Sequence, residues 1–228
     1  MTTQITYDEP ESLRTAGWFV GERTPAPVRL DFRPILELLS GLSDYELDDW
    51  WIRFNRANKD NIGNLEINSE GALLISPFPG WDGSQAQGDF GFDLGQWSKG
   101  YGGQAGGFNL GVRLPNGSRY GPDVCWISGD QLGRIETGLD HILLFCPAFV
   151  AELRTPVDDL RVMRLKMAEY VANGAQLGWL IDPANRQVHI YRPDAAPEVL
   201  DNPETVSGDP VLPGFVFEAR KRIFDLQW

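Results

Sequence analysis

A helical spacing of apolar residues marks the segment 42–61, "LSDYELDDWWIRFNRANKDN". Apolar side chains recur there at intervals of three and four residues between Leu47 and Phe54, as they do on one face of a helix. Ser43 precedes this run and Glu46 follows it by three residues, which is the capping-box pattern of a helix N-terminus. The pattern therefore predicts a helix in this segment.

A second helical pattern covers residues 158–173, where apolar positions from Leu160 to Tyr170 fall on one face and an Asn-Gly pair follows. Residues 84–99 show a weaker helical pattern that several glycines interrupt. Residues 130–140 are compatible with a short helix. We expect a helix in each of these segments.

Strand patterns lie between the predicted helices. The stretch "IGNLEINSEGALLIS", residues 62–76, predicts a β-hairpin with its turn at Ser69 to Gly71. The pair Asn116-Gly117 is a strong signal for another hairpin. The run "LGWLID", residues 177–182, is apolar without interruption, which is typical of a central strand that is buried on both faces.

No repeat and no low-complexity linker divides the chain, so this order of helices and strands predicts one α/β domain over residues 34–228. Residues 1–33 are polar and rich in proline, and we interpret them as an N-terminal extension. The hydrophobic share of 42% is sufficient for a core. Two cysteines are too few for a disulfide framework. With neither a signal-peptide pattern nor a long apolar run, we expect a cytoplasmic protein that has no membrane partner.

The net charge of −12 disfavours a large nucleic-acid-binding surface, although a local basic site on an acidic body is compatible with it. Trp50 and Trp51 are adjacent on a predicted helix, so both cannot face one core. One of them is expected at the interface of a homodimer.

Three acidic residues stand within apolar strand patterns: Glu66, Asp123 and Glu152. A carboxylate is expensive to bury unless it is paired with a cation or bound to a metal. Three such groups on neighbouring strands would form an oxygen-rich site that suits Mg²⁺ or Mn²⁺. An ion of this kind can activate a water molecule and neutralise the charge of a phosphate.

Two basic residues follow closely in the chain. Arg154 stands two positions after Glu152 and therefore shares its face of the strand. Lys166 flanks the apolar face of the 158–173 helix and can lean toward the sheet. Ordinary alternatives remain open for both: an ion pair at a sheet edge for Arg154, and a lysine whose stem covers apolar surface for Lys166.

The stretches "GPDVCWIS", "PAFVAELRTPVDDLRVMRLKMAEYVANGAQLGWLIDPANRQVHIYRP" and "VLPGF" together resemble the Uma-type family (domain of unknown function 820) of the restriction-endonuclease-like PD-(D/E)XK superfamily. The likeness runs from about residue 34 to the C-terminus and is most specific over 121–193. It implies a restriction-endonuclease-like mixed central β-sheet flanked by helices, with additional β-hairpins. It also implies a Mg²⁺-dependent (or Mn²⁺-dependent) endonuclease with DNA as its substrate.

The resemblance assigns roles to individual positions. Asp123 falls on the aspartate of the PD element and Glu152 on the (D/E) position, so both would bind the metal. Glu66 matches an upstream glutamate that would be an additional ligand. Arg154 stands where the motif has lysine, and Lys166 on the following helix would supply the catalytic cation. An arginine cannot act as a general base, so Arg154 would hold phosphate or orient Glu152.

Two other functions remain open. The fold could be a non-catalytic nucleic-acid-binding or assembly module, which the arginine at the lysine position favours. It could also be a metal-dependent hydrolase of a small phosphoester, which the charge of −12 favours.

Overall fold

The computed structural model describes residues 28–62, 64–107, 110–135 and 142–226. Most of the predicted extension over residues 1–33 therefore lies outside the described residues. The helices within them are α2 (Arg33–Leu38), α3 (Asp44–Ile62), α4 (Trp81–Tyr101), α5 (Gly129–Leu132), α6 (Leu160–Ala172) and the π-helix η1 (Arg220–Phe224).

The strands of the described residues form three sheets. A five-stranded sheet has the order β1-β3-β2-β6-β5, a six-stranded sheet has the order β11-β10-β9-β8-β7-β4, and β12 pairs with β13. The strands are β1 (Val28–Asp31), β2 (Asn64–Ile67), β3 (Ala72–Ser76), β4 (Gln104–Gly107), β5 (Val112–Arg113), β6 (Arg119–Tyr120), β7 (Val124–Ile127), β8 (Phe149–Leu153), β9 (Leu177–Asp182), β10 (Gln187–Tyr191), β11 (Glu198–Asp201), β12 (Val206–Ser207) and β13 (Val216–Phe217).

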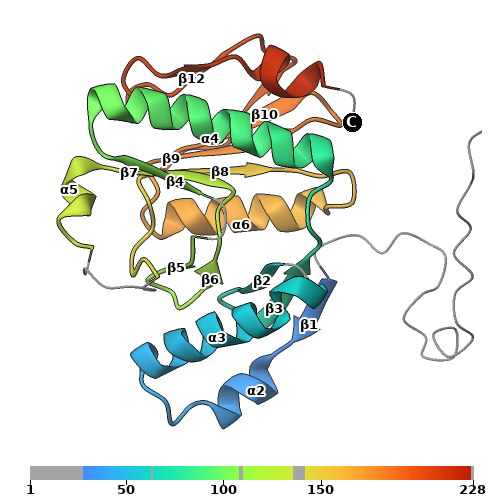
Figure 1. Cartoon of the computed structure of the whole chain (residues 1–228), viewed down its shortest axis with the longest axis vertical. Helices are drawn as coiled ribbons and strands as arrows, with labels where there is room; N and C mark the ends of the chain where they lie inside the picture. Colours follow the sequence, from blue (N-terminus) through green and yellow to red (C-terminus); the bar gives the residue numbers. More distant parts are fainter. Residues whose placement is uncertain (1–27, 63, 108–109, 136–141, 227–228) are drawn as a thin grey trace, which may run out of the picture.

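The molecule is built in layers (Figure 1). α4 covers one face of the six-stranded sheet and α6 covers the other, and these elements form the upper layer. The five-stranded sheet with α2 and α3 lies beyond α6 and forms the lower layer. β8 and β9 are parallel, and α6 is the crossover that connects them. The other neighbouring strands of this sheet are antiparallel. This arrangement confirms the predicted fold class, a mixed central sheet flanked by helices.

The side chains of β8 alternate between the two faces of the six-stranded sheet. Phe149, Ala151 and Leu153 pack in the core under α4. Val150 packs in the second core, which contains the apolar side chains of α6. Glu152 has the same parity as Val150, so it faces α6 and needs polar partners from that helix.

α4 is longer than the weak pattern over 84–99 indicates, since it spans 21 residues. Its stripe of Ala86, Phe90 and Leu94 is buried against the six-stranded sheet. Five glycines lower the intrinsic stability of this helix, and its contact with the sheet compensates for them.

Several predicted elements are confirmed. α3 begins with the predicted capping box, because the backbone N–H of Ser43 donates to Glu46 at 2.8 Å and the Glu46 N–H donates to Ser43 Oγ at 3.4 Å. β2 and β3 form the predicted hairpin. The helix predicted over 130–140 is limited to α5 in the described residues, and residues 136–140 lie outside them.

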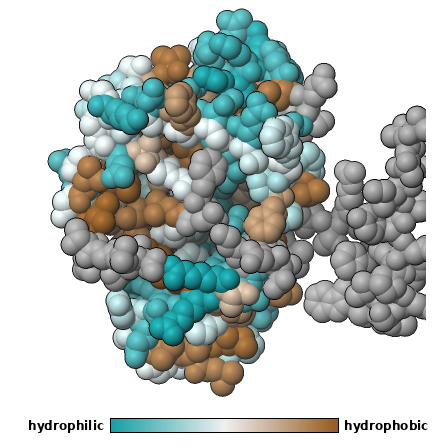
Figure 2. Space-filling view, in the orientation of Figure 1, coloured by the Kyte–Doolittle hydropathy of each residue, from teal (hydrophilic) through white to brown (hydrophobic). Residues whose placement is uncertain are grey.

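The two adjacent tryptophans both pack within the chain. Trp51 is 5% exposed in the core of the lower layer, and the Trp50 ring stacks on Phe54 with centroids 5.0 Å apart. The predicted homodimer therefore gains no support from them and stays a prediction. Figure 2 shows apolar surface over α2, where Ile35 and Leu38 are exposed. None of the helices in the described residues is long and apolar enough to cross a bilayer.

Candidate active site

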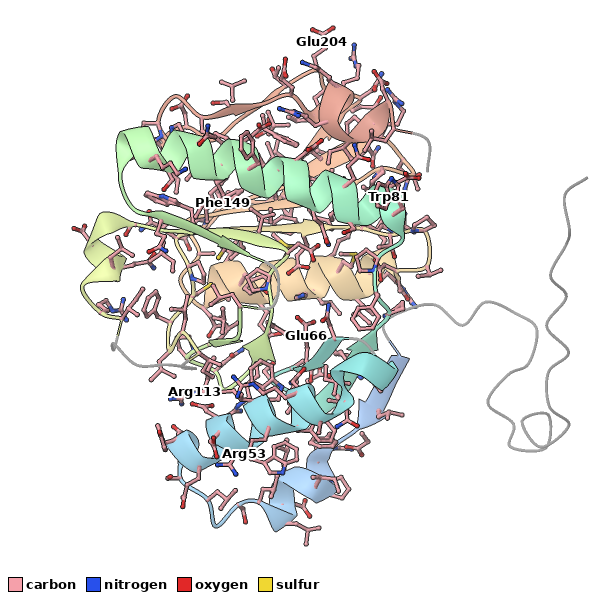
Figure 3. All side chains as sticks on the ribbon, in the orientation of Figure 1. Arg53, Glu66, Trp81, Arg113, Phe149 and Glu204 are labelled. Atoms are coloured by element: carbon pink, nitrogen blue, oxygen red, sulfur yellow. The ribbon has the colours of Figure 1, made fainter. Side chains whose placement is uncertain are left out.

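A cleft opens between the two large sheets, with an empty volume of about 650 Å³ that includes open solvent. Glu66 of β2 lines it from the lower layer and points toward α6 (Figure 3). Asp123, Glu152 and Lys166 line it from the upper layer, together with Gln87 of α4. The structure thus brings four of the five predicted site residues to one cleft.

The pairing of β7 with β8 brings Asp123 close to Glu152. Val124 pairs with Ala151 at the end of this antiparallel ladder, and Asp123 and Glu152 are the next residues along the two segments. The backbone N–H of Leu153 donates to Asp123 Oδ2 at 2.8 Å and fixes that carboxylate beside the end of β8.

A glycine allows the neighbouring strand to approach this corner. A Cβ atom at Gly107 of β4 would lie 2.6 Å from the carbonyl oxygen of Asp123. Any side chain at this position would push the backbone of Asp123 away. Gly107 therefore contributes to the position of Asp123.

Lys166 connects the two layers. Its Nζ lies 2.8 Å from Glu152 Oε1 and 2.9 Å from Glu66 Oε1, and its side chain is 11% exposed. The rings of Tyr120 and Tyr170 flank the ammonium group, with centroids 5.4 Å and 5.8 Å away. Burial lowers the pKa of Lys166, but the carboxylates of Glu152 and Glu66 outweigh burial and raise it above its ordinary value. Lys166 is therefore a fixed cation.

Glu66 reaches the cleft from a different sheet. Its Oε1 accepts hydrogen bonds from Lys166 and from the backbone N–H of Gly121, the latter at 2.7 Å. Gly121 directly follows β6 of the same five-stranded sheet, whereas Lys166 belongs to α6, so Glu66 anchors Lys166 across the cleft. This arrangement favours a role in holding Lys166 over direct metal binding.

Glu152 uses one carboxylate oxygen for its partners in the protein. Oε1 forms the ion pair with Lys166 and accepts a hydrogen bond from the hydroxyl of Tyr170 at 3.1 Å. No hydrogen bond from the described residues reaches Oε2. Burial raises the pKa of Glu152 to about 8, with Asp123 and Glu66 adding to the rise and Lys166 opposing it. Glu152 can thus present a free oxygen to the cleft.

Asp123 lacks a cationic partner. No ion pair involving Asp123 forms within the described residues; its carboxylate accepts from Leu153 and from the side chain of Gln87. Burial raises the pKa of Asp123 to about 6, although Lys166 lowers it from a distance. A carboxylate this poorly compensated is suited to an incoming cation.

The structure places Arg154 outside the residues that line the cleft. It follows the last residue of β8, and its guanidinium binds Asp182 at the end of β9, with an NH1 to Oδ1 distance of 2.9 Å. Its Nε donates to the backbone carbonyl of Asp158 at 3.2 Å. Asp182 is fully buried. These contacts hold the ends of β8 and β9 together, and none of them is made with Glu152.

The residues present fit a small divalent cation only in part. Asp123 and Glu152 supply hard oxygen ligands, which Mg²⁺ prefers. Among the described residues, no group of three His, Cys, Asp or Glu side chains is close enough to hold a metal ion. Mg²⁺ is commonly bound by one or two carboxylates, with water and substrate phosphate completing its coordination. The pair of carboxylates fits that mode, without Glu66.

Two polar residues of the site were not identified from the sequence. Gln87 is buried on the apolar stripe of α4, three positions before Phe90, and a polar residue on such a stripe is the signal that could have found it. Tyr170 looks like an ordinary core residue of α6, and only the structure shows its hydroxyl on Glu152.

Comparisons with known proteins agree with this fold. A family model named Uma2 and described as "Putative restriction endonuclease" matches residues 51–220. A crystal structure described as that of a "putative nuclease belonging to DUF820" from Anabaena variabilis superposes with a TM-score of 0.62 at 24% sequence identity. The match covers 70% of this chain and 89% of that chain. No curated protein matches. The resemblance seen in the sequence is confirmed, and the chain belongs to the Uma2 family, whose model is described as "Putative restriction endonuclease".

Proposed function

We propose that the protein is a Mg²⁺-dependent endonuclease that hydrolyses phosphodiester bonds of DNA. One observation carries the proposal. Asp123, which forms no ion pair with another described residue, is held beside the end of β8, where Glu152 contacts the fixed cation Lys166. Membership of a family described as restriction endonucleases supports the same reading.

Asp123 and Glu152 would hold the ion, with Mn²⁺ as an alternative to Mg²⁺. When bound, the ion would lower the pKa of a water molecule and neutralise charge on the scissile phosphate. Hydrolysis joins the water oxygen to phosphorus and breaks one phosphorus–oxygen ester bond, and the departing sugar oxygen takes up a proton.

Lys166 would stabilise the negative charge that develops on the phosphate oxygens and orient the attacking water. It is suited to this role as a cation, since its raised pKa rules out a role as a general base near neutral pH. Glu66 would keep the ammonium group in position. Arg154 would act at a distance, by fixing the end of β8 on which Glu152 lies.

A plasmid assay tests the proposal. Supercoiled DNA is incubated with the protein and Mg²⁺, with the protein and EDTA, and with an Asp123→Ala variant. We expect nicking by the wild-type protein with Mg²⁺ alone. An Asp49→Asn variant, which alters an exposed acidic residue of α3, should nick as the wild type does. Equal nicking by Asp123→Ala and wild type would refute the assignment.

A non-catalytic nucleic-acid-binding or assembly module is the second candidate. The observation in its favour is that Lys166 already satisfies Glu66 and Glu152, while the described residues contain no three-ligand metal cluster. Calorimetric titration with Mg²⁺ and Mn²⁺ separates the two functions. Binding that Glu152→Gln abolishes supports the endonuclease, and no binding by the wild-type protein supports the module.

A further inference from the structure

The segment from the end of β3 to the start of α4, residues 76–81, borders the cleft, because Pro77 and Pro79 line it. Phe78 stands between these prolines in the chain, and Trp81 follows Pro79 by two residues; neither of the two aromatic side chains lines the cleft itself. Phe78 is 55% exposed and Trp81 is 83% exposed, the largest value among the exposed large apolar side chains of the described residues. Figure 3 shows Trp81 at the start of α4, at the end of the molecule toward which β8 runs. Exposed aromatic residues beside a polar cleft mark a binding surface.

The charges around the cleft are unsuited to a duplex. Lys166 is the one basic side chain among the described residues that line the cleft, and two carboxylates already neutralise it. The nearby Arg154 and Arg161 are paired with Asp182 and Asp159. Proteins that bind double-stranded DNA neutralise the negative charge of several phosphates with lysine and arginine side chains. Affinity at this cleft must therefore come from another source.

Apolar residues line the cleft as well as the carboxylates. They come from β3, β8, α6 and the segment before α4: Leu74, Pro77, Pro79, Leu153, Val162 and Met163. An apolar surface accepts the face of a nucleobase. A base in a duplex offers only its edges, because its faces are covered by the neighbouring base pairs.

We propose that this protein takes nucleic acid through unpaired bases, with Trp81 and Phe78 as a stacking platform at the mouth of the cleft. The phosphate of the same strand would then reach the Asp123–Glu152 edge. This inference rests on the proposed function and specifies its substrate class: single strands, or the unpaired regions of structured DNA. Base stacking on aromatic side chains supplies affinity that depends little on the base sequence. In other proteins a row of basic side chains supplies such affinity.

Fluorescence anisotropy with a labelled mixed-sequence oligonucleotide tests the inference. The single strand and the blunt duplex of the same sequence are compared, first without divalent cation. We expect the single strand to bind about tenfold or more tightly than the duplex, as a stacking contact of one or more bases requires. Trp81→Ala should weaken single-strand binding by about 5- to 150-fold, the equivalent of ~1–3 kcal/mol per stacked base. Trp81→Phe should restore most of the affinity.

Phe92→Ala is the matched control, because Phe92 is an exposed aromatic residue of the same helix that lies about three helical turns beyond Trp81 and the 76–81 segment. Its single-strand affinity should equal that of the wild type. Duplex binding as tight as single-strand binding, or equal losses in Trp81→Ala and Phe92→Ala, would overturn the inference. A Trp81→Ala variant that changes the oligomeric state, measured by sedimentation, and leaves single-strand affinity unchanged would also overturn the inference.

The two proposals fail in different ways. Cleavage of duplex and single strand at equal rates, unchanged by Trp81→Ala, would leave the endonuclease in place and remove the stacking platform. Binding of single strands that depends on Trp81, without cleavage of any substrate, would keep the platform and remove the hydrolysis. Absence of all nucleic-acid binding would overturn the inference.

Discussion

At the scale of single residues, burial of the Asp123 carboxylate lowers the stability of the fold but leaves this carboxylate available to a cation. Its pKa is raised to about 6, so its charged form is disfavoured by folding. The stability that its neutral form provides is complete below the ordinary pKa of about 4 and is lost as the pH rises through about 6. Functional sites commonly carry such a cost.

Asp123→Asn should therefore raise the melting temperature at pH 8 in EDTA, and in a separate assay with Mg²⁺ the variant should not nick DNA. The gain should vanish near pH 4, where Asp123 is protonated as well. Differential scanning fluorimetry across this pH range measures the effect. Asp182→Asn is the contrasting variant, since Asp182 is paired with Arg154 and its neutralisation should lower the melting temperature. A lower melting temperature for Asp123→Asn at pH 8 would contradict this account.

Glu152 should couple metal binding to proton release. Burial raises the pKa of Glu152 to about 8, and a cation that binds this carboxylate would favour its ionised form. Affinity for Mg²⁺ should therefore rise between pH 6 and 9, and ion binding should release protons in that range. Calorimetry in buffers with different ionisation enthalpies measures the number of protons. An affinity independent of pH would show that Glu152 is not a ligand.

The residues that carry a motif could be predicted from the sequence, whereas their supports could not. Asp123, Glu152 and Lys166 have recognisable positions, and the structure brings them to one cleft. Gln87 and Tyr170 do not stand at recognisable motif positions. The hydrogen-bond partner of a polar atom on an apolar stripe depends on how the layers pack, which the sequence does not show.

At the scale of elements, α4 shows how packing replaces propensity. Its buried stripe and its 21-residue length were not evident from the glycine-interrupted pattern. β7, β8 and α6 were easier to predict, because apolar runs mark the two strands and helical periodicity marks the helix. The bounds of β4 could not be predicted, since its Gly107 serves the close approach to Asp123.

Replacing glycines of α4 that have free space should stabilise the protein. A Cβ atom at Gly88 or Gly95 would meet nothing within 4 Å. Each substitution by alanine should raise the free energy of unfolding by ~0.5–1 kcal/mol, or roughly 1–4 °C in melting temperature. Gly107→Ala is the contrasting variant and should destabilise, because its Cβ would clash with the Asp123 carbonyl. Urea unfolding measures the free energy of unfolding of the three variants relative to the wild type.

At the scale of the whole molecule, Glu169 of α6 joins the layers one helical turn beyond Lys166. Its carboxylate accepts from the hydroxyls of Ser118 and Tyr120, from the Asn116 amide at 2.6 Å and from the Ser69 backbone at 3.3 Å. All four donors belong to the hairpin turns and strands of the lower layer. The junction thereby keeps Glu66 within reach of Lys166.

Glu169→Ala should lower the free energy of unfolding by roughly 2–4 kcal/mol, since several hydrogen bonds to a charged group are lost together. Glu204→Ala removes an exposed partner of Arg220 and should change stability by less than about 1 kcal/mol. Urea denaturation followed by tryptophan fluorescence measures both. Equal effects of the two variants would mean that the junction does not hold the layers together.

The arrangement of the layers was the part least accessible from the sequence. The contact between Glu66 and Lys166 joins residues 100 positions apart, one on β2 of the five-stranded sheet and the other on helix α6. Local patterns specify helices and strands, while the stacking of the lower layer on α6 depends on long-range contacts such as those of Glu169. The family resemblance supplied the residue roles without this geometry.

Anomalous diffraction from crystals soaked in Mn²⁺ tests the central claim most directly. The claim is that Asp123 and Glu152 hold one divalent cation beside Lys166. We expect an anomalous peak in the cleft at about 2.0–2.2 Å from a carboxylate oxygen of each acid, with Lys166 retaining its contact to Glu66. An empty cleft in crystals that bind Mn²⁺ elsewhere, or an ion bound without Asp123, would contradict the account.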